Sequence, residues 1–304
     1  MLSNYSDKKS IVSTGNKRLP ALYKNSGDGF LKPKDTISIE SRHFISSLNL
    51  LNLWEYRELF YFLALRDIKI RYKQTLIGIA WVLLQPIITT VIFTTIAFKL
   101  GTGQDPKVPY PLFAFSGLML WIFINSAISN CSNSLINHSG LITKVYFPRL
   151  IIPLSAVGAT LVDLFFGFVS LLIAMLLYGV TPSWKNLLIL PLMIPTLLLT
   201  LGLGILTAAL NVKYRDVKYI LPFILQVFFF ISPIFYSLSI IPAESLWLWK
   251  LNPLTGLMEN FRALLFNQNI DWSSLSISIV ISLLLFLLSV FVFHRMEDDF
   301  ADVI

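Results

Sequence analysis

The sequence predicts an all-α integral membrane protein with six transmembrane helices, and three observations lead to this class. Of the 304 residues, 55% are hydrophobic and only 13% are charged, with a mean hydropathy of +0.70, whereas a soluble domain carries about 25% charged residues. The apolar residues gather in runs that are long enough to cross a bilayer. Lys and Arg concentrate in alternate segments between these runs.

Residues 1–52 precede the first apolar run and differ from the rest of the chain. They are polar, with Ser, Asn, Gly and Pro scattered through them, and they hold eight Lys or Arg against four Asp or Glu. No apolar run lies near Met1, which argues against a secretory signal peptide. We expect a flexible cytosolic tail here.

Residues 53–77 are expected to form an amphipathic helix at the cytoplasmic interface of the membrane. Its cationic face holds Arg66, Lys69 and Lys73 at i, i+3 and i+7. The neighbouring face is apolar and holds Tyr61, Leu65, Ile68 and Tyr72. Such a helix places its apolar side chains in the lipid and its cations toward the head groups and the cytosol.

The first span follows this helix directly. No charged residue lies between Gly78 and Phe98. Residues 78–100 would make a helix about 35 Å long, against a hydrocarbon core of about 30 Å. A cationic helix that continues into a membrane span is therefore the element around which the chain is organised.

Five further apolar runs complete an expected transmembrane domain of residues 78–296, and residues 297–304 are expected to be a cytosolic C-terminus. The six expected spans are about 78–100, 112–131, 150–180, 187–210, 220–240 and 275–293. The second span turns polar near its end, at Asn125, Ser126, Ser129 and Asn130. Pro233 interrupts the fifth span. Residues 241–269 are too apolar for a solvated loop and each half is too short to cross, so we expect interfacial or re-entrant short helices there.

The distribution of Lys and Arg sets the orientation of the six spans. With the N-terminus inside, the cytoplasmic segments hold eleven Lys or Arg even without the tail, and the opposite segments hold five. Cytoplasmic loops carry the excess of Lys and Arg in membrane proteins. The count predicts a multi-pass protein of the inner (cytoplasmic) membrane with both termini in the cytosol.

The motifs of an enzyme are missing from this sequence. It has no G-x-x-x-x-G-K-[ST] motif, no Ser/His/Asp or Cys/His arrangement, and no metal-ligand spacing among its three His. A membrane glycosyltransferase or lipid phosphatase would need acidic or His-rich motifs at the membrane border. An ion-coupled carrier usually has inverted repeats and several intramembrane charges, whereas Asp163 is the one acidic residue in these spans. We therefore predict that the chain is not an enzyme and binds no cofactor or metal itself.

Five segments, in this order, carry a resemblance to a known family. They are RDIKIRYKQTLIGIAWVLLQP (66–86), PYPLFAFSGLMLW (109–121), LITKVYFPRLIIPLSAV (141–157), ALNVKYRDVKYILPF (209–223) and LNPLTGLMENFR (251–262). Through them the chain resembles the membrane (permease) subunits of type-2 ABC exporters, of the polysaccharide export group, and within that group the O-antigen export permeases. The resemblance covers about residues 53–295, and the polar tail before it is longer than the family usually carries.

The resemblance implies partners and a cargo. It implies a six-span subunit that forms a homodimer and pairs with two copies of a separate ABC ATPase, which binds the ATP and Mg. The implied cargo is a polyprenyl-diphosphate-linked polysaccharide of the O-antigen type, moved out of the cytoplasmic leaflet, and no nucleic acid is involved. Export of a teichoic-acid or capsular polysaccharide, or of a small molecule, remains the alternative.

The resemblance also implies which residues couple the permease to the ATPase. In the family, the helix before the first span and the short turns after spans two and four face the ATPase. The matching residues are Arg66, Asp67, Lys69, Arg71, Lys144, Tyr146, Arg149, Tyr214, Arg215 and Asp216. Composition alone would explain the last turn as cationic membrane anchors with interfacial tyrosines.

Some further residues are candidates on their own chemistry. Arg71 and Lys73 lie at the membrane border, where cations would attract a lipid-linked diphosphate or anchor the helix to head groups. Asp163 lies inside the third span, where a carboxylate is costly, and it would line a conduit or pair with a neighbouring helix. Phe229 and Tyr236 flank Pro233 and could stack on sugar rings in a conduit, although contact with core or lipid is the simpler interpretation.

Overall fold

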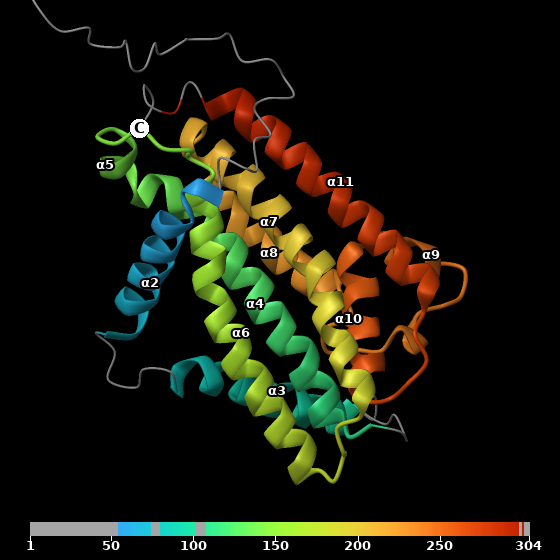
Figure 1. The fold of residues 1–304 in the computed structure, drawn as a ribbon. Coiled ribbons are helices and arrows are strands. Elements are labelled where there is room, and N and C mark those ends of the chain that lie inside the picture. The colour runs from blue at the N-terminus through green and yellow to red at the C-terminus, as the bar shows by residue number, and fades with distance from the viewer. Residues whose placement is uncertain (1–53, 74–79, 101–107, 298–299, 301–304) are drawn as a thin grey trace, which may run out of the picture. The chain divides into compact units, whose positions relative to one another are not determined.

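The computed structural model describes residues 54–73, 80–100, 108–297 and 300, so the expected tail of residues 1–52 lies outside it. The described part is helical and contains no strand, which confirms the predicted all-α fold (Figure 1). The elements are α2 (Arg57–Lys73), α3 (Ala80–Leu100), α4 (Tyr110–Asn137), α5 (Ser139–Ile142), α6 (Ile151–Leu177), η1 (Trp184–Leu188), α7 (Ile189–Lys213), α8 (Val217–Ile231), η2 (Leu238–Ile240), α9 (Leu246–Leu251), α10 (Pro253–Leu265) and α11 (Trp272–Glu297).

Five of the described helices are long and apolar enough to cross a membrane. They are α3, α4, α6, α7 together with η1, and α11. The fifth expected span corresponds to α8, which has 15 residues and is therefore about 22 Å long, shorter than a hydrocarbon core of about 30 Å. The chain is a multi-pass membrane protein, while the count of six spans stays a prediction.

The expected fifth span, 220–240, is wrong in its extent, because α8 ends at Ile231. Ser232 has an extended backbone, with ψ of 146°, as expected for a residue before a proline. After this break the carbonyl groups of Pro233 and Ile234 are outside the helix. Both accept hydrogen bonds from the guanidinium of Arg262, at 2.7 and 2.5 Å. The buried Arg262 thus pairs with two carbonyl groups that follow the end of the helix.

The predicted short helices of residues 241–269 are present as α9 and α10. The side chains of α10 are almost all buried, and this helix packs on α11, α7 and α4. Its Arg262 also stacks over the ring of Phe113 in α4, with 3.7 Å between the guanidinium carbon and the ring centroid. α10 is therefore part of the protein core, whereas Trp247, Leu248 and Leu251 of α9 are exposed.

α11 begins at Trp272, and the preceding residue, Asp271, caps its N-terminus. Its carboxylate accepts the backbone N–H groups of Ser273 and Ser274 at 3.1 and 3.4 Å and the ammonium of Lys250 at 3.0 Å. Burial by itself raises the pKa of Asp271, but the hydrogen bonds from Ser273, Lys250 and Ser274 outweigh it and hold that pKa well below its usual range.

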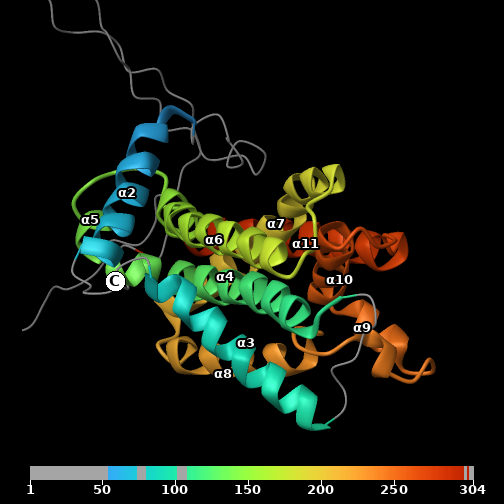
Figure 2. The ribbon, with the colours of Figure 1, turned by 90° about the horizontal axis from the view of Figure 1, so that it is seen from below.

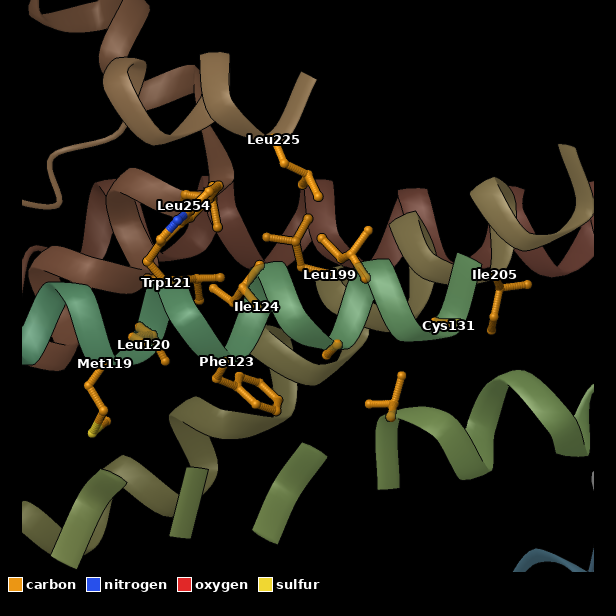
Figure 3. Packing of buried hydrophobic residues seen from close by; sticks show 14 of the residues in the cluster. Met119, Leu120, Trp121, Phe123, Ile124, Cys131, Leu199, Ile205, Leu225 and Leu254 are labelled. Atoms are coloured by element: carbon orange, nitrogen blue, oxygen red, sulfur yellow. The ribbon is translucent and has the colours of Figure 1, made fainter. Parts of the chain in front are cut away.

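α4 lies at the centre of the bundle and packs against α6, α7, α3 and α8 (Figure 2). Figure 3 shows Ile124 of α4 pointing toward Leu199 of α7, and Met119 and Phe123 on the opposite side of α4. The helices approach closely where a Cβ on Gly204 would lie 2.7 Å from the sulfur of Cys131. α4 continues to Asn137, beyond the expected end at residue 131, and this end contacts α7: the amide of Asn211 donates to the backbone carbonyl of Ser132 at 3.0 Å.

α2 and α5 lie at one end of the bundle and α9 lies at the other (Figures 1 and 2). α2 packs across α6 through Leu63 and Ala64, and a Cβ on Gly158 of α6 would lie 3.0 Å from the ring of Phe60. Sequence reasoning did not single out this face. Because α2 packs through this third face, the residues of its two predicted faces are exposed or half-buried.

Candidate functional site

A cavity of about 800 Å³ lies between the end of α2, the first half of α3, and the middle of α4 and α6. Its polar lining residues come from all four helices and are Arg71, Tyr72, Gln85, Asn125, Ser126, Ser129, Asn130, Thr160 and Asp163. The remaining wall is apolar and includes the ring of Trp81. A volume of this size is typical of a small-ligand site.

An ion pair lies in the wall of this cavity. The guanidinium of Arg71 donates to one oxygen of Asp163, and the hydroxyl of Tyr72 donates to the other. Asp163 lies near the middle of α6, where a carboxylate facing lipid would be costly. Of the two roles expected for Asp163, pairing with a neighbouring element is observed, and the residue also lies in the cavity wall.

α4 contributes a polar face to the cavity. Asn125, Ser126, Ser129 and Asn130 are spaced at i, i+1, i+4 and i+5, which places them on one side of a helix. The amide of Asn130 donates to the hydroxyl of Ser126 at 3.3 Å. The carboxamides of Asn125 and, across the cavity, Gln85 make no hydrogen bond to another residue within the described ranges. The polar spacing was visible in the sequence, but the opposite wall that makes it a cavity was not.

The predicted cationic face of α2 is exposed, as are Tyr61, Phe62 and Ile70. Arg66, Lys69 and Lys73 are all exposed, and with Phe62, Leu65 and Ile70 they line a shallow hollow. Arg66 pairs with its neighbour Asp67 at 3.0 Å, and Asp67 lies 3.8 Å from Nε2 of His138. Because His138 is buried where α4 meets α5, Asp67 connects α2 to the loop that follows α4.

The predicted coupling residues of the α5–α6 loop divide into two groups. Lys144 and Tyr146 are exposed, Tyr146 to 85%, while the neighbouring Phe147 is buried and holds the loop on the bundle. Arg149 instead donates to the backbone carbonyl of Glu297 at the end of α11. Its guanidinium therefore links the start of α6 to the last turn of α11.

The predicted residues of the α7–α8 turn are all exposed. Tyr214 is 54% exposed, and Arg215 and Asp216 follow it at the start of α8. The ammonium of Lys213 lies 5.9 Å from the ring centroid of Tyr214. Asp216 precedes the first residue of α8, a position where a negative charge is favourable to the helix dipole.

Phe229 and Tyr236 lie away from the cavity lining. Phe229 packs among aromatic rings of other elements, with centroids 5.7 Å from Trp121 and 5.5 Å from Phe235. The hydroxyl of Tyr236 donates to the carbonyl of Ile231 at 2.8 Å and accepts from Nε1 of Trp249 at 3.1 Å. Both residues have a packing role around the break after α8.

Comparisons with known proteins agree on one family. A family model described as ABC-2 type transporter matches residues 58–266. The O-antigen export system permease protein RfbA of Myxococcus xanthus is 28% identical over 255 residues, which is 83% of this chain and 97% of that protein. RfbA of Klebsiella pneumoniae is 29% identical over 79% of this chain and 92% of its own length. The polysialic acid transport protein KpsM of Escherichia coli is 28% identical over 65% of this chain and 77% of its own length.

Proposed function

Because the chain belongs to the ABC-2 type transporter family, we propose that it is the permease subunit of an ATP-driven polysaccharide exporter. The proposed cargo is an O-antigen-type glycan on polyprenyl diphosphate, moved across the inner membrane. The similarity to O-antigen export permeases over almost their whole length carries this proposal. The similarity to KpsM favours a capsular polysaccharide as the second candidate cargo.

The ATPase is proposed to bind at the end of the bundle formed by α2, the α5–α6 loop and the α7–α8 turn. These elements carry exposed charges next to exposed aromatic side chains, as at Lys144 with Tyr146 and Arg215 with Tyr214. Aromatic residues and Arg are enriched in protein interfaces. ATP and Mg would be bound by that partner, and closure of its nucleotide-binding domains would push on these elements of a permease dimer.

Within this surface the ten proposed coupling residues have different environments. Arg66, Lys69, Tyr214, Arg215 and Asp216 are exposed. Arg149 and Arg71 are held by Glu297 and Asp163, so their effect on coupling would pass through the packing of α6. Since Arg71 has a counter-ion, we assign attraction of the lipid-linked diphosphate to the exposed Lys73.

The test is charge reversal in the α7–α8 turn. The variant Arg215→Glu with Asp216→Arg should reduce both co-purification of the ATPase and the glycan at the cell surface, because it inverts the charges that face the partner. Glu244→Lys reverses an exposed charge between α8 and α9, away from this surface, and should change neither. Normal binding and normal export in the double variant would disprove the coupling assignment. The proposed function itself is tested by complementation of a strain that lacks this permease. If the wild-type chain, expressed with its ATPase, fails to restore surface glycan to that strain, the proposed function is wrong.

A further inference from the structure

The cavity between α2, α3, α4 and α6 has an unusual lining for its depth in the membrane. Asn125 and Asp163 lie near the middle of α4 and α6, where polar side chains that face hydrocarbon are destabilising. The carboxamides of Gln85 and Asn125 have no hydrogen-bond partner among the described residues. The unpaired carboxamide of Asn125 at this depth, together with that of the exposed Gln85 near the start of α3, points to a polar occupant of the cavity.

The types of polar group indicate the chemistry of this occupant. Apart from the hydroxyl of Tyr72, which donates to Asp163, the uncharged polar side chains are carboxamides and hydroxyls, from Gln85, Asn125, Ser126, Ser129, Asn130 and Thr160. Carboxamides and hydroxyls both donate and accept hydrogen bonds, as the hydroxyl groups of a sugar do, whereas an anion accepts only. The lining therefore matches a polyol better than it matches a phosphate.

The charges in the wall support the same choice. Arg71 and Asp163 form an ion pair, so the charged groups of the lining sum to zero. A phosphate bound to Arg71 would also lie close to the carboxylate of Asp163. Two negative charges close together repel strongly in a medium of low dielectric constant. An uncharged ligand avoids this repulsion.

An aromatic ring completes the site. Trp81 lines the cavity and is 57% exposed. Its indole face offers an apolar surface against which the C–H side of a sugar ring can lie, while the carboxamides face the hydroxyl groups. Ligand sites commonly combine an aromatic wall with a few placed polar groups.

We infer that this cavity binds uncharged sugar residues of a glycolipid within a single copy of the chain, with Gln85, Asn125 and Asn130 as the recognising groups and Trp81 as the stacking surface. The inference rests on the proposed function, because it takes the cargo to be a lipid-linked glycan. It adds a place where the permease holds the sugar, separate from the cationic face of α2.

A cysteine reporter in the full-length chain tests this inference. Ile122→Cys places a thiol in the cavity wall and leaves every polar lining group in place. The wild-type chain is the blank, since its one cysteine, Cys131, is fully buried. The chain is reconstituted in phosphatidylcholine nanodiscs, and the rate of alkylation by N-ethylmaleimide is measured with increasing dodecyl maltoside or with dodecyl phosphate. The two probes share an alkyl chain and differ in an uncharged sugar or an anionic head group.

Dodecyl maltoside should slow the alkylation of the reporter and dodecyl phosphate should not. Adding Asn125→Ala with Asn130→Ala should raise the half-protecting concentration of maltoside about tenfold, because each lost hydrogen bond weakens binding severalfold. The matched control is Asn133→Ala on the same helix, because Asn133 is not among the lining residues of the cavity and its amide donates to the backbone carbonyl of Ser129. It should leave the protection unchanged.

Three results would overturn the inference: equal protection by both probes, no protection by dodecyl maltoside, or a reporter thiol that does not react even without a probe. The last result would mean that lipid or a second copy of the chain already fills the cavity. Measuring the glycan on the surface of cells distinguishes failure of this inference from failure of the proposed function. If the wild-type chain exports glycan but dodecyl maltoside does not protect the reporter, only the sugar site is disproved. If dodecyl maltoside protects the reporter but the wild-type chain exports no glycan, the proposed function is disproved.

Discussion

Replacing Asp163 with Asn is expected to destabilise the packing of α2 on α6. In the wild-type chain the carboxylate accepts hydrogen bonds from Arg71 and Tyr72. The side chains of Arg71 and Asp163 are 28% and 14% exposed. Asn keeps the shape of the side chain and one acceptor oxygen, but it removes the negative charge and leaves the guanidinium in a partly buried site without a counter-ion.

The exposure of the two side chains sets how much stability the substitution Asp163→Asn is expected to cost. Breaking a fully buried ion pair costs about 3–5 kcal/mol, and an exposed pair is worth about 0–1 kcal/mol. The intermediate exposure of Arg71 and Asp163 places the expected loss near 2 kcal/mol on this scale. Adding Arg71→Gln to Asp163→Asn should recover part of this loss, because no charge is then left unpaired.

Equilibrium unfolding in mixed detergent micelles, followed by circular dichroism, measures these differences. Lys69→Gln is the control, because Lys69 is an exposed cation of the same helix and its replacement should change the stability by less than about 0.5 kcal/mol. The reasoning is refuted if Asp163→Asn is as stable as this control. It is also refuted if the Arg71 and Asp163 substitutions are simply additive.

Three further predictions use the same unfolding measurement. In Gly117→Ala the new Cβ would lie 2.2 Å from Nη2 of Arg262 and 2.3 Å from the oxygen of Ile234, whereas in Gly140→Ala it meets nothing within 4 Å. The first should lose about 1–3 kcal/mol and the second should not, and equal stabilities would contradict the packing described for α4. Arg262→Met leaves two buried carbonyl groups unpaired and should cost about 3 kcal/mol or more; a near-neutral effect would exclude Arg262 as the anchor of the break after α8. The lowered pKa of Asp271 means that its carboxylate stabilises the fold above the unfolded pKa of about 3.9 and that this contribution is lost as the pH falls toward the folded value. The wild-type advantage over Asp271→Asn should therefore be present near about pH 7 and shrink near about pH 3, and a constant difference would exclude this linkage.

Much of the fold follows from local pattern, because the residues that decide it are neighbours in the chain. The apolar runs predict the long helices, and the end of α8 follows from Pro233. The exposed cationic face of Arg66, Lys69 and Lys73 follows from their spacing. Ends of helices were less predictable: α4 extends past the apolar run, and its polar end contacts Asn211, which lies far along the chain.

The candidate site was only partly predictable, since the sequence shows which polar residues lie in a span but not what they face. Asp163 was recognisable as a costly charge, and its partner Arg71 was instead expected to contact the ATPase or phosphate. Arg149 was expected at the ATPase surface, yet it binds the end of α11. Arg262 was one of the five Lys or Arg expected in the non-cytoplasmic segments and had no other expected role, although it is a buried anchor.

The sequence by itself therefore determined the helices, the membrane environment and the cationic end of the bundle. In a bilayer every backbone polar group must be satisfied within the segment, so an apolar run of sufficient length has only the helix open to it. The tertiary structure alone decided the cavity and its ion pair, because Arg71 and Asp163 are 92 positions apart in the chain. Whether two such residues meet depends on how α2 crosses α6, which is set by the contacts of Leu63, Ala64 and Gly158 and not by any local pattern.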